Sequence, residues 1–397
     1  MSEPLTESQK EIDMLVSNAL KALDEYENYD QEKIDYIVAK ASVAALDQHG
    51  LLAKYAVDET KRGVFEDKAT KNLFACEYVV NNMRHLKTVG IVDDDEVSGI
   101  VKIAEPVGVV AALTPVTNPT STAIFKALIC LKTRNPIIFS FHPSAINCSI
   151  AAAKIVYDAA VLAGAPKNCI QWIEAPSMEK TNDLMNHSGV STILATGGNA
   201  MVKAAYSCGK PALGVGAGNV PAYIEKTANI KQAVNDIVMA KSFDNGMVCA
   251  SEQIAIIDKE IYTETIKTFK EYKAYLATAE EKKLLEKYMF GVIDDPAAAK
   301  LNADIVGMNP STLAKNAGFD IPEGTTIILA ECKEVGVSEC LTREKLSPVL
   351  AVVKASNTDD GLAKAKAGVC FNGLGHSAAI HTTNKKLAEK LKSMRIN

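Results

Sequence analysis

Residues 107–113, VGVVAAL, open a stretch in which short apolar runs alternate with helical segments as far as Val215. The apolar runs indicate buried strands at Val107–Leu113, Pro136–Phe141, Cys169–Ile173, Val190–Thr196 and Ala212–Val215, and the segments between them predict helices at Thr120–Thr133, Ser144–Ala163, Met178–His187 and Asn199–Ser207. Strands that alternate with such helices are typical of right-handed βαβ units and a mostly parallel sheet. A sheet of this kind binds ligands at the carboxyl ends of its strands.

The flanking segments complete an α/β architecture. The first 75 residues predict helices, with a capping box formed by Thr6 and Gln9 and a second helix after Asp30. Residues 88–106 predict an antiparallel hairpin whose turn is the acidic run 93–96. The alternation resumes after Asn219 with strands Val220–Ile224 and Gln253–Ile257 and helices Ile230–Lys241 and Ile261–Ala274. We therefore expect one domain over 1–217, with the hairpin inserted, and a second α/β domain over 218–397.

The composition excludes several classes of protein. The chain has 397 residues, a net charge of −5 and 48% hydrophobic residues, which allows two or three ordinary globular domains. A mildly acidic chain is not typical of a nucleic-acid-binding protein. No apolar run of about 18 residues predicts a membrane span, and the N-terminus lacks a signal peptide. Nine cysteines without a C-x-x-C pair predict free thiols in a reducing cytoplasm and no metal site.

The stretch Phe243–Gln253, FDNGMVCASEQ, is the most informative one for chemistry. Its Asn-Gly pair predicts a tight turn, and Cys249 follows directly. A thiol on such a turn has backbone N–H groups nearby, which favour the thiolate and can donate to an oxyanion. The alternative is a cysteine that is simply buried as a small apolar side chain.

Two further residues lie where ligand-facing loops are expected. Asn118 follows the first predicted strand of the sheet, so its amide can donate to an oxyanion, or its side chain can cap the helix that begins near Thr120. His376 is preceded by Gly373 and Gly375, which allow the backbone to approach a ligand closely.

Two glycine clusters differ in the element that follows them: one precedes a helix and the other a strand. Thr196-Gly197-Gly198 follows a strand and precedes a helix, so it is either an ordinary turn or a site where backbone N–H groups face a nucleotide. Gly214-Val215-Gly216-Ala217-Gly218 leads into a strand. A dinucleotide fingerprint must open a helix, so this cluster is not one. It is a turn between strands that either has no further role or lines an active site.

Together these motifs resemble the aldehyde dehydrogenase superfamily, most closely its CoA-acylating branch. That branch includes acetylating acetaldehyde dehydrogenases and the N-terminal half of bifunctional aldehyde–alcohol dehydrogenases. The resemblance spans almost the whole chain and is carried by residues 117–126, 131–135, 194–198, 214–219, 243–253 and 344–348. It implies an aldehyde dehydrogenase-like fold, with a Rossmann-type NAD-binding domain over 1–217, an oligomerisation hairpin over 88–106 and a catalytic domain over 218–397.

The resemblance also implies roles for individual residues. Cys249 matches the nucleophile, Asn118 the side-chain donor to the oxyanion, and Glu344 the glutamate that holds the nicotinamide ribose. His376 resembles a histidine of the acylating branch that assists coenzyme A or the hemithioacetal proton. The residues matched to NAD binding are Thr117, Ser140, His142, Pro143, Gly197, Gly198, Gly214 and Gly216.

One departure from the family defines the expected reaction. Hydrolytic members carry a glutamate that activates water at the position that Gly214 occupies here. A general base is typically worth about 10²–10⁴-fold in rate, so we expect coenzyme A rather than water to accept the acyl group. The expected activity is reversible conversion of an aldehyde, CoA and NAD to acyl-CoA and NADH, with acetaldehyde as substrate. The alternatives are butanal or succinate semialdehyde as substrate, or an inactive remnant.

The resemblance also suggests a wider context. The family continues beyond residue 397, so we expect this chain to be truncated at its C-terminus. For the full-length protein we expect a cytoplasmic homo-oligomer, fused to an iron-dependent alcohol dehydrogenase domain if the enzyme is bifunctional.

Overall fold

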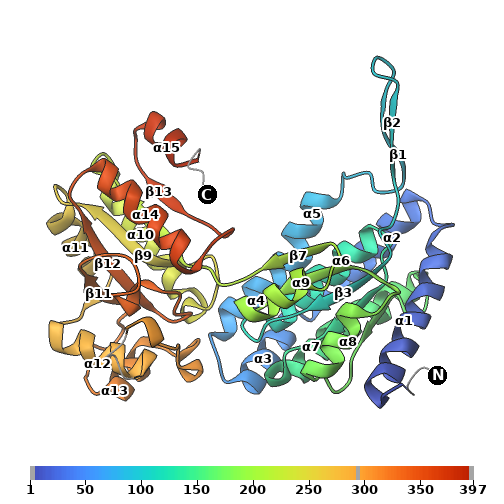
Figure 1. Cartoon of the computed structure of the whole chain (residues 1–397), viewed down its shortest axis with the longest axis horizontal. Helices are drawn as coiled ribbons and strands as arrows, with labels where there is room; N and C mark the ends of the chain where they lie inside the picture. The colour runs from blue at the N-terminus through green and yellow to red at the C-terminus, as the bar shows by residue number, and fades with distance from the viewer. Residues whose placement is uncertain (1–4, 292–295, 393–397) are drawn as a thin grey trace. The chain divides into compact units, whose positions relative to one another are not determined.

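The structure is a computed structural model, which describes residues 5–291 and 296–392. The chain divides into two compact units (Figure 1). Unit 1 comprises residues 1–61 and 65–215, and unit 2 comprises residues 62–64 and 216–397. The chain therefore enters unit 2 at residue 62 and returns to unit 1 at residue 65.

Unit 1 is built on a five-stranded parallel sheet of order β5-β4-β3-β6-β7. Its strands are β3 (Val109–Leu113), β4 (Ile137–Ser140), β5 (Ile170–Trp172), β6 (Val190–Thr196) and β7 (Ala212–Val215). Its longer helices are α1 (Glu7–Tyr26), α2 (Gln31–Asp47), α3 (His49–Thr60), α4 (Phe65–Leu73), α6 (Pro119–Lys132), α7 (Ile146–Leu162), α8 (Met178–Asn186) and α9 (Asn199–Ser207). The predicted strands and helices of this sheet are confirmed in position. The prediction that Ala212–Val215 is buried is wrong, because Leu213 and Val215 of the edge strand β7 are exposed.

Alternation along β3 explains why helices cover both faces of this sheet. Val110 and Ala112 pack into a core with α2, α6 and α7, whereas Val109, Ala111 and Leu113 pack into a core with α1, α8 and α9. Successive strand residues point to opposite faces, so a strand that is apolar throughout must be covered on both sides. A short π-helix, Phe74–Tyr78, joins α4 to α5 (Val79–Met83) beside the first of these cores.

Unit 2 is built on a six-stranded parallel sheet of order β10-β11-β12-β9-β8-β13. Its strands are β8 (Val220–Ile224), β9 (Glu252–Asp258), β10 (Tyr275–Leu276), β11 (Ile328–Cys332), β12 (Val349–Ala355) and β13 (Ala379–His381). Helices α10 (Ile230–Ser242) and α11 (Tyr262–Glu271) pack on one face. The other face packs against α12 (Ala279–Phe290), α13 (Pro310–Ala317), α14 (Thr358–Asn372) and α15 (Lys385–Lys392).

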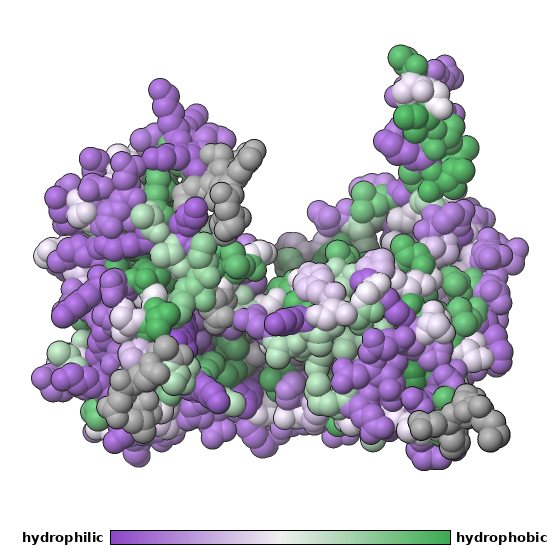
Figure 2. Space-filling model, viewed as in Figure 1, coloured by the Kyte–Doolittle hydropathy of each residue, from purple (hydrophilic) through white to green (hydrophobic). Residues whose placement is uncertain are grey.

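The predicted hairpin is confirmed as β1 (Gly90–Asp95) and β2 (Ile100–Ala104), which project from unit 1 (Figure 1). The predicted turn is wrong in position, because residues 93–95 belong to β1 and the turn lies at residues 96–99. Asp95 terminates the strand, since its carboxylate accepts hydrogen bonds from the N–H groups of Val97 and Ser98. Apolar side chains of this hairpin are exposed, as Figure 2 shows; they are Ile91, Val92, Val97, Ile100, Val101 and Ile103.

Within residues 5–291 and 296–392, one segment, Pro143–Leu162, is long and apolar enough to cross a membrane by length and composition. It contains α7, which packs against α2 and α6 in the first core of unit 1. An apolar helix of a domain core passes the same test, so this segment is weak evidence for a membrane span.

Candidate active site

The turn that precedes Cys249 is left-handed and tightly held. After α10, residues 243–246 form a single 3₁₀ turn in which Asp244 and Asn245 have φ values of 50° and 51°. This left-handed region is unfavourable for residues with a Cβ, so surrounding contacts must hold the turn. The Asp244 carboxylate accepts a hydrogen bond of 2.7 Å from the Val64 N–H, and the Asn245 amide donates one of 2.9 Å to the Gly307 carbonyl.

Gly246 confirms the Asn-Gly turn. Its φ is +72°, and a Cβ there would lie 2.5 Å from the Ser347 carbonyl oxygen. The chain then leads to Cys249, which is half-buried, and β9 begins at Glu252. Six of the other cysteines are fully buried, so Cys249 is among the few thiols that a ligand can reach.

Gly218 brings three predicted site residues together. A Cβ on Gly218 would lie 1.9 Å from the carbonyl oxygen of Cys249 and 3.0 Å from Nε2 of His376. Its N–H donates a hydrogen bond of 2.7 Å to Oε1 of Glu344. Segments more than 100 residues apart in the sequence therefore meet at one glycine, which must lack a side chain for them to do so.

Hydrogen bonding defines the tautomer of His376. The Ser377 N–H donates to Nδ1 of His376 at 3.0 Å, so the neutral ring carries its proton on Nε2, the atom nearest Gly218. Burial lowers the pKa of His376 below its usual value of 6.5. Neutral His376 consequently presents an N–H donor beside the Cys249 backbone.

Two buried lysines, Lys241 and Lys345, lie next to Glu344. Burial raises the pKa of Glu344, while the Gly218 N–H and the neighbouring Lys241 and Lys345 favour its ionised form. Lys345 is fully buried, and its Nζ donates to the carbonyl oxygens of Gln253, Leu341 and Arg343 at 2.6–3.0 Å. Burial lowers the pKa of Lys345 to about 7. This network anchors the backbone on both sides of Glu344.

Part of the glycine cluster lies in the predicted strand Ala212–Val215, and the turn begins at Gly216. Gly214 belongs to β7 of unit 1, where the Tyr206 hydroxyl bonds to both its N–H and its carbonyl. The turn itself contains Gly216 and Gly218. It leads into a strand, β8, as predicted, and not into the helix that a dinucleotide fingerprint requires. Asn219 holds this turn, because its amide donates to the Thr342 and Gly368 carbonyls at 2.9 Å.

In unit 1, Asn118 lies between β3 and α6. It is the residue that precedes α6, but its side chain makes no capping hydrogen bond, so the alternative of a helix cap is wrong. Pro119 at the first helical position has no N–H to be satisfied, which lessens the need for a cap. The Asn118 Oδ1 instead accepts a hydrogen bond of 2.6 Å from Lys71, and Nδ2 donates one of 3.1 Å to the Thr117 hydroxyl.

The remaining predicted nucleotide-binding residues of unit 1 follow β4 and β6. His142 and Pro143 are exposed, whereas Ser140 is buried, with its hydroxyl 2.7 Å from that of Thr181. Gly197 and Gly198 precede α9, and a Cβ on Gly198 would meet no atom within 4 Å. The backbone at Gly198 is therefore open to a ligand.

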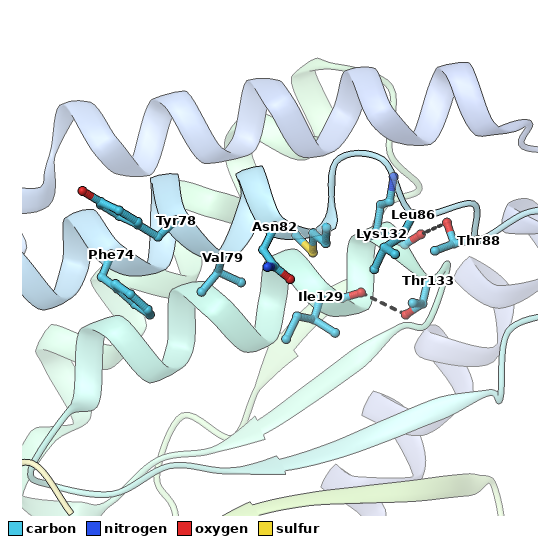
Figure 3. A pocket seen from close by; sticks show the side chains of 10 residues that line it. Phe74, Tyr78, Val79, Asn82, Leu86, Thr88, Ile129, Lys132 and Thr133 are labelled. Atoms are coloured by element: carbon cyan, nitrogen blue, oxygen red, sulfur yellow. Dashed lines mark hydrogen bonds between the residues drawn. The ribbon is translucent and has the colours of Figure 1, made fainter. Parts of the chain in front are cut away.

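An apolar groove of about 570 Å³ lies elsewhere in unit 1, between α5 and α6 (Figure 3). Phe74, Tyr78, Leu86 and Ile129 contribute to its lining. It contains none of the predicted site residues. Among the described residues, no group of three or more His, Cys, Asp and Glu side chains is placed to hold a metal ion.

Sequence reasoning missed the supporting residues Lys71, Asn219, Lys241 and Lys345. Lys345 had a signal, since it lies directly after Glu344 within a matched motif. Lys71 and Lys241 lie on ordinary helices, and no motif indicates a role for either. Lys71 bonds to Asn118, 47 residues away, and Lys241 bonds to Gln253 on the next strand.

Comparison with known proteins agrees with this geometry. Residues 5–395 match the model of the aldehyde dehydrogenase family. Aldehyde-alcohol dehydrogenase 2 of Entamoeba histolytica is 66% identical over 384 residues, which cover 96% of this chain and 44% of that protein. The chain thus spans less than half the length of this curated relative.

Solved structures give the same result. An acetylating aldehyde dehydrogenase from Geobacillus thermoglucosidasius has a TM-score of 0.93 at 43% identity, over 98% of this chain and 85% of that one. A propionaldehyde dehydrogenase of Rhodopseudomonas palustris, solved with bound CoA and an acylated cysteine, has a TM-score of 0.84 at 29% identity, over 96% and 84% of the two chains. The predicted fold class and resemblance are confirmed, and the chain belongs to the aldehyde dehydrogenase family.

Proposed function

We propose that the chain is an NAD-dependent, CoA-acylating aldehyde dehydrogenase that converts acetaldehyde, CoA and NAD⁺ reversibly to acetyl-CoA and NADH. The observation that carries the proposal is the meeting of Cys249, His376 and Glu344 at Gly218. The acetylating activity in the name of the Geobacillus relative supports it.

In the proposed first step, the Cys249 thiolate attacks the aldehyde carbon. A carbon–sulfur bond forms, and the carbonyl π electrons move to the oxygen. The Asn118 amide and the Cys249 backbone N–H donate to this oxyanion, which is where preorganised donors contribute most to rate. Bound NAD⁺ would supply the hydride acceptor for this site, and loss of hydride from the hemithioacetal carbon would leave a thioester on Cys249.

In the second step, CoA loses its thiol proton to solvent and attacks the thioester as a thiolate. A carbon–sulfur bond to CoA forms, the bond to Cys249 breaks, and Cys249 leaves as the thiolate. The Nε2–H of neutral His376 is the proposed donor that orients the CoA sulfur and stabilises it as a thiolate in the reverse direction. Gly214 provides no carboxylate to activate water, so hydrolysis lacks a base worth about 10²–10⁴-fold.

The residues present fit NAD. The open backbone at Gly198 and the N-terminus of α9 suit a phosphate or a nicotinamide. The Glu344 side chain lies beside Gly218 and accepts a hydrogen bond from its N–H, and its carboxyl oxygens can accept hydrogen bonds from a ribose. Thr117, His142 and Pro143 lie at or after the carboxyl ends of β3 and β4, where parallel sheets bind nucleotides. These residues, with Ser140, Gly197, Gly214 and Gly216, remain the proposed binding set.

The test is NADH formation from acetaldehyde with and without CoA, with analysis of the product. The expected result is strict dependence on CoA and acetyl-CoA as product. Equal rates without CoA, with acetate as product, would contradict the acylating assignment. Propanal, butanal and succinate semialdehyde in the same assay distinguish the alternative substrates, and absence of turnover with every aldehyde identifies an inactive protein.

The context of the reaction is also proposed. Unit 1 is the NAD-binding domain, unit 2 the catalytic domain, and the β1–β2 hairpin the element through which copies associate in a cytoplasmic oligomer. The Entamoeba relative is named for aldehyde and alcohol dehydrogenation. We propose an iron-dependent alcohol dehydrogenase as the fused partner of a full-length bifunctional form.

A further inference from the structure

Asn118 is held by side chains of a helix that the proposed mechanism does not use. Helix α4 contributes two contacts to the loop between β3 and α6 and one to the first turn of α6. The Lys68 Nζ donates to the Thr117 carbonyl at 3.2 Å, and the Lys71 Nζ donates to the Asn118 Oδ1 at 2.6 Å. The fully buried Asn72 accepts a hydrogen bond of 2.8 Å from the Thr120 hydroxyl.

The contact with Lys71 determines which way the Asn118 amide faces. A lysine ammonium has only donors, so the atom opposite it must be the amide oxygen. The amide NH₂ then points away from Lys71, and one of its hydrogens bonds to the Thr117 hydroxyl at 3.1 Å. Within the described part of the chain, no acceptor takes the second hydrogen of Nδ2.

This arrangement matters because an asparagine is an oxyanion donor in only one of its two amide orientations. In the other orientation its oxygen faces the oxyanion and repels it. The ammonium of Lys71 also polarises the amide, which strengthens the remaining N–H as a donor. Donors that are oriented before the reaction need no reorganisation in the transition state.

We propose that Lys71 is a positioning residue, which orients and polarises the Asn118 amide as the side-chain donor to the oxyanion. The proposal rests on the proposed function, since it assumes the oxyanion role of Asn118. Asn72 and Lys68 hold the loop as a whole, whereas Lys71 acts on the amide itself.

The experiment is a double-mutant cycle on a half-reaction that needs no nicotinamide. The Cys249 thiolate attacks the thioester of acetyl-CoA, CoA leaves as the thiolate, and the enzyme gains one acetyl group that intact mass spectrometry counts over time. The variants are Lys71→Met, Asn118→Ala and their combination, with Lys54→Met on α3 as the control for loss of an exposed lysine. Thermal unfolding and the Kd for acetyl-CoA are measured alongside.

Lys71→Met is expected to slow acetylation about 10–10²-fold without a comparable change in Kd, because loss of one oxyanion donor costs about 10²–10³-fold and misorientation loses part of it. Lys71→Arg is expected to recover part of the rate. In the Asn118→Ala background, Lys71→Met is expected to have no further effect, since the two residues act as one unit.

A wild-type rate for Lys71→Met, or an equal loss in both backgrounds, would overturn the positioning role. A wild-type rate for Asn118→Ala would instead refute the oxyanion role in the proposed function, so the two failures are distinguishable. If Lys71→Met does not fold, Lys71→Gln replaces it in the same cycle under the same criteria.

Discussion

The two units hold the proposed site residues by different means. In unit 2, Cys249, His376 and Glu344 approach the backbone of Gly218 so closely that no side chain fits there. In unit 1, Asn118 is oriented by the long side chain of Lys71. Backbone packing around a glycine leaves no room for change, whereas a contact made by a flexible side chain tolerates a similar replacement.

The largest expected effect in unit 2 comes from the sulfur itself. Cys249→Ser should abolish CoA-dependent turnover, by about 10⁴-fold or more, because loss of a covalent nucleophile removes the intermediate. Steady-state NADH formation measures the loss. Cys208→Ser in unit 1 is the matched control, since Cys208 is also half-buried and bonds only to the carbonyl of its own helix. Retained activity in Cys249→Ser would assign the nucleophile elsewhere.

The substitution Gly218→Ala disrupts the close packing of the Cys249 backbone against Gly218. The added Cβ must displace the Cys249 carbonyl, which it would approach to 1.9 Å, and a shift of about 1 Å at a reacting group can reduce the rate about 10²-fold. The acetylation rate with acetyl-CoA measures this loss. Gly50→Ala on α3 is the control, because its Cβ meets no atom within 4 Å and alanine favours a helix. Equal rates for the two variants would show that close packing at Gly218 is unimportant.

The hydrogen bond from Ser377 predicts how the His376 site responds to acid. Burial lowers the pKa of His376, so the neutral ring persists somewhat below pH 6.5, and protonation of Nδ1 then breaks the bond from the Ser377 N–H. Acyl transfer to CoA should therefore decline as the pH falls through a midpoint below 6.5, and recover as the pH rises.

His376→Gln keeps an N–H donor without the titration. It should be about 10–10²-fold slower and should lose this acid dependence. His381→Gln is the control, since burial also lowers the pKa of His381. An unchanged acid limb in His376→Gln would contradict the assignment.

The smallest effect on the acetylation rate is expected from residues that hold the segment around Asn118 without contacting its amide. Thr120→Val removes the hydroxyl that bonds to the buried Oδ1 of Asn72, and an unsatisfied buried acceptor costs about 1–3 kcal/mol of unfolding free energy. Urea unfolding measures this change. The acetylation rate should fall less than about tenfold, because Lys71 still orients Asn118. A rate loss as large as that of Lys71→Met would remove the distinction between holding the loop and orienting the amide.

The sequence predicted the positions of helices and strands better than it predicted contacts between residues on different elements. Strands β6 and β7 and helix α9 begin and end as predicted, since apolar runs bounded by turn residues define them locally. The hairpin turn was misplaced because its acidic residues suit a turn, yet cross-strand pairing, such as the bond from Lys102 to Asp93, extends the strand through them.

The site residues show the same limit. Cys249, Asn118, Glu344 and His376 were identified from short motifs and their resemblance to a family, and the structure brings three of these together at Gly218. The contact from Lys71 to Asn118 joins residues 47 positions apart on separate elements. No local pattern specifies such a pair, because only the packing of α4 beside the loop creates it.

The turn before Cys249 also bears on how the protein ages. Asparagine followed by glycine is the pair most prone to deamidation, in which the next backbone nitrogen attacks the side-chain amide and ammonia is lost. Here the Asn245 amide is tied to the Gly307 carbonyl, and its backbone is fixed in a left-handed turn. These contacts should slow deamidation of this labile pair, which lies shortly before the proposed nucleophile Cys249. Peptide mapping after storage would detect deamidation as aspartate or isoaspartate at residue 245.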